Sequence, residues 1–475
     1  MSSKRQKTQL LLAFATESRG ESPIAAVEGT ELPVAKPDAE SPTQTGSLME
    51  EVCQRDNLWK ALKRVQANKG APGVDGMTVR QLPKYLKRHW LKIREQLLTG
   101  TYRPQPVKRV EISKPDGGVR KLGVPAALDR FIQQAVLQIL QERWDRTFSE
   151  HSYGFRPGRS AHQAVAQAQA YIAEGYGYTV DIDLEKFFDR VNHDMLMGRV
   201  AKRVEDKRML KLIRAFLNAG IMENGLVSPS EEGTPQGGPL SPLLSNLMLD
   251  DLDKELERRG LRFVRYADDC NIYVRSRRAG ERVMQSITRF ITDKLKLKVN
   301  ESKSAVARPA DRKFLGFSFT RSQQPKRRIA PKSLLRFKKR IRELTKRNRG
   351  VSLDQMVADL RRYLTGWRGY FGFCQTPSVF PTLDSWIRRR LRCFQWKQWK
   401  SGRTRFAELR QRGVGKDLAA QTAGSSRGLW HVSRSPALSI ALPSAYFDSL
   451  GLPASAKPNV LPTEPPWYGP VCPVV

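Results

Sequence analysis

The sequence contains no run of about 18 uninterrupted apolar residues, and this absence excludes a membrane-spanning helix. Its five cysteines are widely scattered and include no Cys-x-x-Cys pair, so neither a disulfide framework nor a structural zinc site can be built from local spacing. The first 50 residues lack the apolar core of a signal peptide and are too acidic for an organellar transit peptide. We therefore expect a soluble, cytoplasmic protein in a reducing compartment.

Acidic residues are scarce relative to basic ones. Lys and Arg total 83 against 47 Asp and Glu, which gives a formal net charge of +36 and a pI near 10.3. No fold requires such an excess, so it indicates a polyanionic partner, with nucleic acid as the first candidate. The excess is concentrated in one part of the chain, because residues 321–412 hold 26 Lys and Arg but only 5 Asp and Glu.

Composition predicts several domains along the 475 residues. Residues 1–50 mix Pro, Ser, Thr and Glu without periodicity and predict a disordered leader, whereas residues 51–322 show the alternating helical and strand patterns of a mixed α/β domain. The basic residues 323–415 read as helices with aromatic stripes, residues 416–450 are less regular, and residues 451–475 form a Pro-rich tail.

A first acidic segment has the pattern of a half-buried strand. In residues 178–184, alternation puts Val180 and Ile182 on one face and Asp181 and Asp183 on the other. Asp183 stands at the end of this strand, where its carboxylate can face a site.

A second acidic segment lies about eighty residues further on. Asp268 and Asp269 stand between two β-prone runs, so we expect a hairpin that presents both carboxylates at its tip. Taken alone, an aspartate pair in a turn is more often a solvated loop. Together with Asp183, however, the pair supplies the hard oxygen ligands that Mg²⁺ prefers, and two such ions can assist an in-line phosphoryl displacement.

Seven ordered segments resemble group II intron reverse transcriptases with maturase activity, most closely the bacterial class that lacks an endonuclease domain. The resemblance covers about residues 56–450. The segments are GAPGVDG at 70–76, ISKPDGG at 112–118 with RKLGVP at 120–125, SYGFRPGRS at 152–160, FFD at 187–189, GTPQGGPLSP at 233–242, YADD at 266–269 and FLGF at 314–317. The resemblance implies a right-hand polymerase: an α/β fingers and palm region with an antiparallel sheet, then an α-helical thumb and maturase domain.

The same resemblance implies an RNA-directed DNA polymerase with Asp183, Asp268 and Asp269 as catalytic Mg²⁺ ligands. The family's metal-binding aspartate stands five residues before a phenylalanine, which fits Asp183 with Phe188; Asp181 is a second choice. Phe188 is implied to form the floor of the sugar pocket, where a ring beneath C2′ excludes a ribose hydroxyl.

Further resemblances concern the incoming nucleotide and the primer. The implied nucleotide-binding residues are Lys114, Arg120, Arg156, Gln236 and Lys303, the last as a proton donor to departing pyrophosphate. A solvated surface charge, or for Gln236 an ordinary turn residue, is the alternative for each of them. Leu315 and Gly316 resemble the primer grip, although an edge strand would have the same apolar content.

The basic segment allows two interpretations. Leu360, Leu364, Trp367 and Phe371 recur at helical spacing and predict a helical core rather than base-stacking platforms. The charges exceed what solubility requires and predict a surface for structured RNA. The predicted RNA-binding residues are Arg388, Arg389, Arg390, Arg392, Lys397 and Lys400.

Residues 363–371 resemble the family's maturase region, and residues 416–450 resemble its short DNA-binding extension. The implied partners are the group II intron RNA, an RNA template with a DNA primer, the target DNA and deoxyribonucleoside triphosphates, and the implied location is the cytoplasm, at the nucleoid when DNA is bound. Two alternatives stay open, namely a maturase that only assists splicing and a reverse transcriptase used in host defence or with CRISPR.

Overall fold

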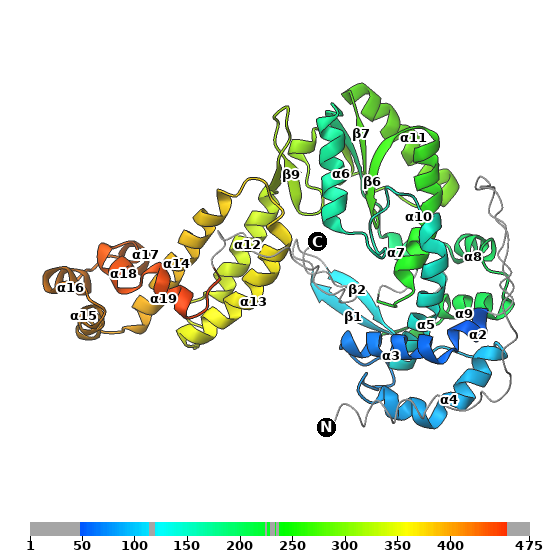
Figure 1. Cartoon of the computed structure of the whole chain (residues 1–475), viewed down its shortest axis with the longest axis horizontal. Coiled ribbons are helices and arrows are strands. Elements are labelled where there is room, and N and C mark those ends of the chain that lie inside the picture. Colours follow the sequence, from blue (N-terminus) through cyan, green and yellow to red (C-terminus); the bar gives the residue numbers. More distant parts are fainter. Residues whose placement is uncertain (1–47, 114–118, 224–225, 229–232, 234–236, 454–475) are drawn as a thin grey trace, which may run out of the picture. The chain divides into compact units, whose positions relative to one another are not determined.

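The computed structural model describes residues 48–113, 119–223, 226–228, 233 and 237–453 (Figure 1). These residues form two compact units. The larger unit contains the residues up to 164 together with 178–306, and the smaller unit contains 165–177 and the residues from 307 onward. Helix α2 (Leu48–Val52) begins inside the stretch that was expected to be disordered, because Leu48 and Met49 are buried.

Helices form the N-terminal part of the larger unit. They are α2, α3 (Arg55–Ala67), α4 (Leu82–Leu98), α5 (Ala127–Trp144) and, from later in the chain, α9 (Lys207–Leu217). Apolar residues recur every three or four positions in α4, so that Leu82, Leu86 and Trp90 all face the core. The apolar side chains of α4 therefore belong to the same buried cluster as those of α3 and α5.

A four-stranded sheet with the order β2-β1-β4-β5 adjoins these helices. Its strands are β1 (Val107–Ser113), β2 (Val119–Val124), β4 (Ile221–Glu223) and β5 (Leu226–Ser228). Strand β1 pairs antiparallel with β2 and parallel with β4. The segments at 112–118 and 120–125 thus include parts of both arms of one hairpin, and residues 114–118 lie outside the described part.

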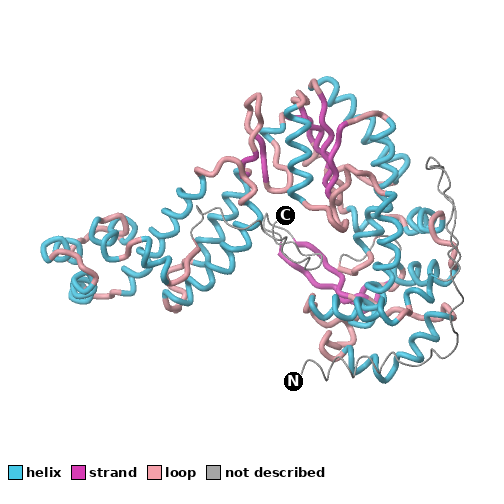
Figure 2. The backbone as a smooth tube through the Cα atoms, viewed as in Figure 1, coloured by secondary structure: helices cyan, strands magenta, loops and turns pink. Residues whose placement is uncertain are grey.

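A second four-stranded sheet, with the order β6-β7-β3-β8, carries the acidic segments (Figure 2). Its strands are β3 (Tyr178–Ile182), β6 (Arg262–Tyr266), β7 (Asp269–Val274) and β8 (Ala305–Ala307). Strand β7 pairs antiparallel with both β3 and β6. Val180 and Ile182 are fully buried on one face of β3, as the alternation predicts.

Two long helices cover this sheet. Helix α10 (Ser241–Arg258) packs against β6, and α11 (Arg277–Leu295) packs against β3 and β7. Shorter elements of the larger unit are η1 (Asp145–Thr147), α7 (Phe187–Arg190) and α8 (His193–Ala201). Most of α6 (Ala161–Ala173) and all of η2 (Pro309–Asp311) belong to the smaller unit. The expected mixed α/β fold with antiparallel strand pairing is confirmed, with the β1–β4 pairing as a parallel addition.

The smaller unit is mainly helical. It contains a hairpin of β9 (Phe317–Phe319) and β10 (Arg327–Ile329), followed by α12 (Pro331–Leu344), α13 (Leu353–Phe371) and α14 (Val379–Gln398). The Trp367 ring lies 4.1 Å from the Phe337 ring and 4.9 Å from the Phe371 ring, between centroids. Leu360, Leu364, Trp367 and Phe371 are all buried, so the prediction that they form a helical core is confirmed.

Five short helices end the described chain. They are α15 (Gly402–Gln411), α16 (Lys416–Ala423), α17 (Leu429–Val432), α18 (Pro436–Ala441) and α19 (Ser444–Ser449). Ala437, Leu438 and Phe447 are fully buried, so these helices pack although each is short. No helix in the described residues is long and apolar enough to cross a membrane.

Candidate active site

Strand register brings the three predicted catalytic aspartates to the same end of one sheet. Ile182 of β3 pairs with Cys270 of β7, and extending this antiparallel register by one residue sets Asp183 opposite Asp269. Tyr266 pairs with Asp269 across the β6–β7 hairpin, so Asp268 stands in the turn. The hairpin predicted from the sequence is therefore present, with the carboxylate-bearing residues of two chain segments side by side.

The backbone of Asp183 is fixed by the turn that precedes β8. Its N–H donates to Ser304 Oγ at 3.0 Å, and its carbonyl accepts from the Asn300 N–H at 2.8 Å. The same turn brings Lys303 Nζ to 3.6 Å from Asp183 Oδ1. Lys303 was predicted to be a nucleotide-binding residue that donates a proton to pyrophosphate, and its ammonium lies beside the carboxylate of Asp183.

The donor set has the chemistry of a divalent-cation site, because carboxylate oxygens are the ligands that Mg²⁺ prefers. Across the described residues, no three His, Cys, Asp or Glu side chains are already gathered into a metal-binding group. Asp183 is instead paired with an ammonium. The strand register and the type of ligand thus fit a divalent cation. The side-chain carboxylates, however, do not form a ready-made metal-binding group in the described residues.

A buried arginine lies beneath the acidic turn. Arg265 is 0% exposed, and its guanidinium donates to the two carboxylate oxygens of Asp253 at 2.7 and 2.5 Å. Its other N–H groups donate to Asn246 Oδ1 at 3.0 Å, to the Ala267 carbonyl at 2.9 Å and to Ser152 Oγ at 2.8 Å. Arg265 was not among the residues predicted from the sequence, although an arginine directly after the apolar pair Phe263 and Val264 was a visible signal.

Glycines bring the segment at 233–242 close to two other segments. A Cβ on Gly233 would lie 2.8 Å from the Phe188 carbonyl oxygen, and a Cβ on Gly237 would lie 2.2 Å from the Gly123 carbonyl oxygen. Both glycines have positive φ, so only glycine fits these approaches without strain. Gly237 follows directly on Gln236, which itself lies outside the described residues, as does Lys114; the side chain of Arg120 is not described either.

Phe188 lies in α7 directly after the acidic strand. The helix begins directly after Lys186, whose φ of 50° turns the chain sharply after β3. The Phe188 ring is half-buried and packs edge-on against Phe187, with 5.2 Å between the ring centroids. The Phe188 ring is thus partly exposed, and its role as the floor of a sugar pocket stays a prediction.

Arg156 is placed differently from its predicted role. Its side chain is 4% exposed and donates to Asp145 Oδ1 at 2.9 Å, to the Ser149 carbonyl at 2.5 Å and to the Ser152 carbonyl at 3.0 Å. It also donates to the Asp145 carbonyl at 2.7 Å. These bonds hold residues 145–156 together, so in this structure the guanidinium is used internally rather than presented to a nucleotide phosphate.

The predicted primer grip belongs to the smaller unit. Leu315 and Gly316 both have positive φ, and they form the tight turn before β9. The Leu315 carbonyl accepts from Tyr370 Oη at 2.7 Å, and the Gly316 carbonyl accepts from Ser333 Oγ at 3.0 Å. The turn is therefore anchored to α12 and α13 through its backbone, and the Leu315 side chain is buried.

The four predicted RNA-binding arginines of α14 are engaged within the smaller unit. Each guanidinium donates to an acceptor on another element. The acceptors are Asp448 Oδ1 for Arg388 (3.0 Å), the Trp430 carbonyl for Arg389 (2.7 Å), Thr345 Oγ1 for Arg390 (2.6 Å) and the Leu442 carbonyl for Arg392 (3.0 Å). The structure thus differs from the expected free arginine surface, because these groups join α14 to the C-terminal helices and to the end of α12.

The other residues at the end of α14 and just after it separate into core and surface. Phe394, Trp396 and Trp399 are buried, so they pack in the core of the unit rather than forming stacking platforms. Lys397 and Lys400 are exposed. Of the predicted RNA-binding set, these two lysines are the members whose side chains face solvent.

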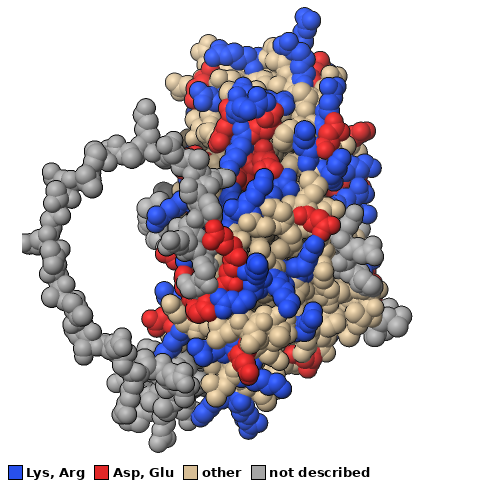
Figure 3. Space-filling model, turned by 90° about the vertical axis from the view of Figure 1, so that its right-hand side faces the viewer, with Lys and Arg blue, Asp and Glu red and all other residues tan. Residues whose placement is uncertain are grey.

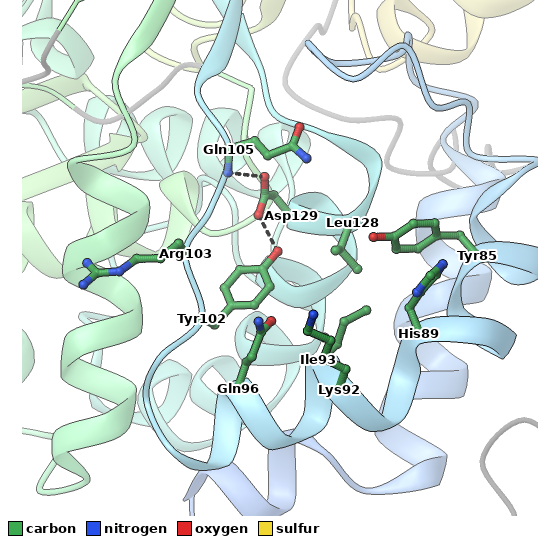
Figure 4. Close-up of a pocket in the computed structure, with 10 residues that line it drawn as sticks. All are labelled: Tyr85, His89, Lys92, Ile93, Gln96, Tyr102, Arg103, Gln105, Leu128 and Asp129. Atoms are coloured by element: carbon green, nitrogen blue, oxygen red, sulfur yellow. Dashed lines mark hydrogen bonds between the residues drawn. The ribbon is translucent and has the colours of Figure 1, made fainter.

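A cavity of about 280 Å³ lies elsewhere in the larger unit, between α4 and the start of α5 (Figure 4). The carboxylate of Asp129 is buried beside it and accepts from Tyr102 Oη at 2.7 Å and from the Gln105 N–H at 3.0 Å. Burial raises the pKa of Asp129 to about 6, in spite of these two hydrogen bonds. None of the predicted site residues lines this cavity.

The surface reflects the composition. On the face shown in Figure 3, Lys and Arg side chains lie on both sides of a group of Asp and Glu side chains. A surface rich in Lys and Arg would attract a phosphate backbone.

The chain matches two family models and several known proteins. Residues 112–319 match the family model for reverse transcriptase (RNA-dependent DNA polymerase), and residues 334–413 match the model for the group II intron maturase-specific domain. Protein YkfC of Escherichia coli (strain K12) is 33% identical over 312 residues, which cover 57% of this chain and 81% of that protein. Group II intron-encoded protein LtrA of Lactococcus lactis subsp. cremoris is 36% identical over 211 residues, which cover 44% of this chain and 35% of LtrA. A solved structure titled partial Cas6-RT-Cas1–Cas2 complex covers 56% of this chain and 46% of its own at 25% identity, with a TM-score of 0.34.

The antiparallel sheet that carries these aspartates lies within the segment that matches the reverse transcriptase model. The protein is therefore an RNA-directed DNA polymerase by class. The match of residues 334–413 to the maturase-specific domain restricts this class to the enzymes of group II introns. This chain belongs to the group II intron reverse transcriptase/maturase family. The matched region spans four-fifths of YkfC but about a third of LtrA, so the substrates and partners of the whole protein are stated below as proposals.

Proposed function

We propose that this protein extends a DNA primer on an RNA template, and that it also binds the group II intron RNA and promotes its splicing and its insertion into target DNA. The observation that carries the first part is the strand register, which sets Asp183 opposite Asp269 at the end of one sheet. The register brings the backbones of two segments about eighty residues apart to one sheet end, and an in-line nucleotidyl transfer needs carboxylates from both segments around its metal ions. We also propose that the protein acts in the cytoplasm, at the nucleoid when DNA is bound.

Asp183, Asp268 and Asp269 are the proposed ligands of Mg²⁺, which would stabilise the attacking and leaving oxygens of the transfer. Lys303 lies beside Asp183, where its ammonium can supply a proton to departing pyrophosphate. The half-buried Phe188 ring is the proposed barrier to a ribose 2′ hydroxyl, which selects deoxyribonucleotides.

The nucleotide phosphates are proposed to meet the β1–β2 hairpin and the glycine-rich segment beside it. Lys114 and Arg120 belong to the hairpin segments, and Gln236 immediately precedes Gly237, which approaches β2 at Gly123. The internal bonds of Arg156 favour a supporting role for that residue, because they fix the 145–156 segment.

Intron RNA is the proposed partner of the smaller unit, on the basis of its maturase-specific match and its excess of basic residues. Within the predicted set, the exposed Lys397 and Lys400 are the direct contacts that we propose, since ammonium groups on the surface can reach phosphates. The four arginines would support RNA binding indirectly, because their hydrogen bonds hold the helices of the smaller unit in place.

The test is primer extension by an Asp268→Asn variant. Replacing one carboxylate by a neutral amide removes a charged metal ligand, so extension on a primed RNA template should be abolished. Affinity for the same template should persist, because the basic surface is unchanged. A variant that extends primers at the wild-type rate would rule out the proposed site, and a wild-type chain that assists splicing without extending primers would support the splicing-only alternative.

A further inference from the structure

The turn that carries Asp268 and Asp269 contains an unfavourable backbone conformation. Ala267 has a φ of 56°, which is a left-handed conformation that alanine adopts at an energetic cost. Such a residue persists only where its surroundings hold it. Whatever holds Ala267 therefore also fixes the direction in which the next two side chains leave the backbone.

Two groups hold this residue. From one side, Arg265 donates to the Ala267 carbonyl at 2.9 Å. From the other side, the backbone of Gly154 approaches so closely that a Cβ there would lie 2.3 Å from the Ala267 nitrogen. Asn246 connects the two groups, because it donates to the Gly154 carbonyl at 2.8 Å and accepts from Arg265 at 3.0 Å.

We propose that Arg265 is a positioning residue whose guanidinium fixes the Ala267 carbonyl and thereby orients Asp268 and Asp269. The proposal rests on the proposed function, since it concerns the same carboxylates. Arginine suits this place because its planar fork offers five N–H donors at once, and here they reach α10, the segment at Ser152 and the turn. A lysine ammonium could not reach three elements in this geometry.

The partner of Arg265 explains how a cation can lie behind an acidic site without neutralising it. Asp253 is 0% exposed and faces the guanidinium through two hydrogen bonds, so the pair carries no net charge. The guanidinium can therefore hold the backbone of the turn while the carboxylates of Asp268 and Asp269 keep their charge for a cation. Buried arginines are found almost solely in such paired arrangements.

A purely structural role is the competing explanation, in which the ion pair serves only to fasten β6 to α10. The two explanations differ for a double variant, Arg265→Met with Asp253→Leu. Removing both charges together leaves no unpaired buried ion, so the fold should survive. The bond to the Ala267 carbonyl is nevertheless lost, and only the positioning role then predicts a change at the acidic turn.

The matched control is Arg199→Met with Asp251→Leu. Arg199 Nη2 lies 2.6 Å from Asp251 Oδ2, and Asp251 is also on α10, but its side chain is 47% exposed. The guanidinium of Arg199 also donates to the Met195 carbonyl on α8, away from the acidic turn. The control therefore removes an ion pair from the same helix and leaves Arg265 intact. A second positive variant is Gly154→Ala, which should displace Ala267 directly while keeping the guanidinium.

Two measurements are made on the full chain. Hydrogen exchange without metal or nucleic acid reports local opening of residues 266–270, and calorimetry with Mn²⁺ as the probe reports cation binding. In the double variant we expect faster exchange at the turn and a dissociation constant for Mn²⁺ that rises roughly 10- to 100-fold, as for other groups that orient metal ligands. Primer extension should then need correspondingly more Mg²⁺, while affinity for primed template stays unchanged.

Wild-type exchange and wild-type Mn²⁺ binding in the folded double variant would overturn the positioning role. If the double variant does not fold, Arg265→Lys decides, because it keeps a charge for Asp253 and loses the fork; an unaltered turn in that variant would also overturn the proposal. Failure of the proposed function is distinguishable, since it would show as a wild-type chain that does not extend primers, whereas the exchange experiment needs no activity.

Discussion

Arginine is used differently in the two units of this protein. In the larger unit, Arg156 and Arg265 are almost completely buried, and each donates to several acceptors in one small region. In the smaller unit, Arg389 and Arg392 are half-buried and reach from α14 to helices near the end of the described chain. Both uses join segments that are far apart in sequence. In the larger unit the buried guanidinium fixes the backbone of one small region, whereas in the smaller unit the half-buried guanidinium joins one helix to another.

This difference shows that a cluster of basic residues in the sequence does not by itself predict a nucleic-acid-binding surface. The arginines at 388–390 look like a phosphate-binding cluster, yet each has a protein acceptor. A guanidinium connects elements well because it donates in several directions, whereas an ammonium is more strongly hydrated and stays at the surface. Lys397, near the end of α14, and Lys400, just after that helix, follow this division.

The largest effect should come from leaving Arg265 buried and unpaired. Asp253→Leu alone should lower the free energy of unfolding of the larger unit by about 3 to 5 kcal/mol, because the guanidinium loses its counter-charge at a fully buried site. Denaturant unfolding measures this loss. The surface variant Asp251→Leu should cost less than about 1 kcal/mol, and equal losses in the two variants would contradict the contrast between buried and exposed pairs.

A buried carboxylate of the larger unit should give a pH-dependent stability. The pKa of Asp129 is raised by burial from its ordinary value of 3.8 to about 6, so folding favours the protonated form. Its contribution is fully present below about pH 4 and is lost as the pH rises through about 6, a change of about 3 kcal/mol. Unfolding measured from pH 4 to 7 should show this decline, and Asp129→Asn should flatten it. A parallel decline in the Asn variant would assign the effect to other groups.

The acidic sheet could be predicted from the sequence because its determinants are local. Alternation of Val180 and Ile182 with Asp181 and Asp183 defines the strand, and the β-prone runs around Asp268 define the hairpin. Helical spacing likewise identified the aromatic core of α13. In each case, the pattern that decides burial lies within one element.

The partners of the arginines could not be predicted in this way. Arg265 bonds to Ser152, 113 residues away, and Arg388 bonds to Asp448, 60 residues away. Nothing in the residues next to Arg388 distinguishes a phosphate ligand from an anchor for α19. The tertiary fold decides between these roles, because it determines which acceptors come within reach of the guanidinium.

A moderate effect should follow from loosening the C-terminal helices. Arg389→Gln removes a hydrogen bond to the Trp430 carbonyl and a guanidinium that lies 3.8 Å from the centre of the Trp430 ring. We expect a loss of about 1 to 2 kcal/mol and faster proteolysis within residues 428–449. Arg403→Gln, at an exposed position of α15, is the control with the same change of charge. If both variants resist proteolysis like the wild-type chain, Arg389 does not anchor this region.

The smallest effect on stability, and the most selective effect on binding, should come from the exposed lysines. Lys397→Gln with Lys400→Gln should change the free energy of unfolding by less than about 0.5 kcal/mol, since both side chains face solvent. If each contacts a phosphate, the slope of log affinity against log salt for a structured intron RNA should become shallower by roughly 0.7 to 0.9 per lysine. Arginine at both positions should restore the slope, because it keeps the charge. An unchanged slope in the glutamine variant would mean that the RNA-binding surface does not include these two lysines. A shallower slope with intact primer extension would show that intron binding and polymerisation use different residues.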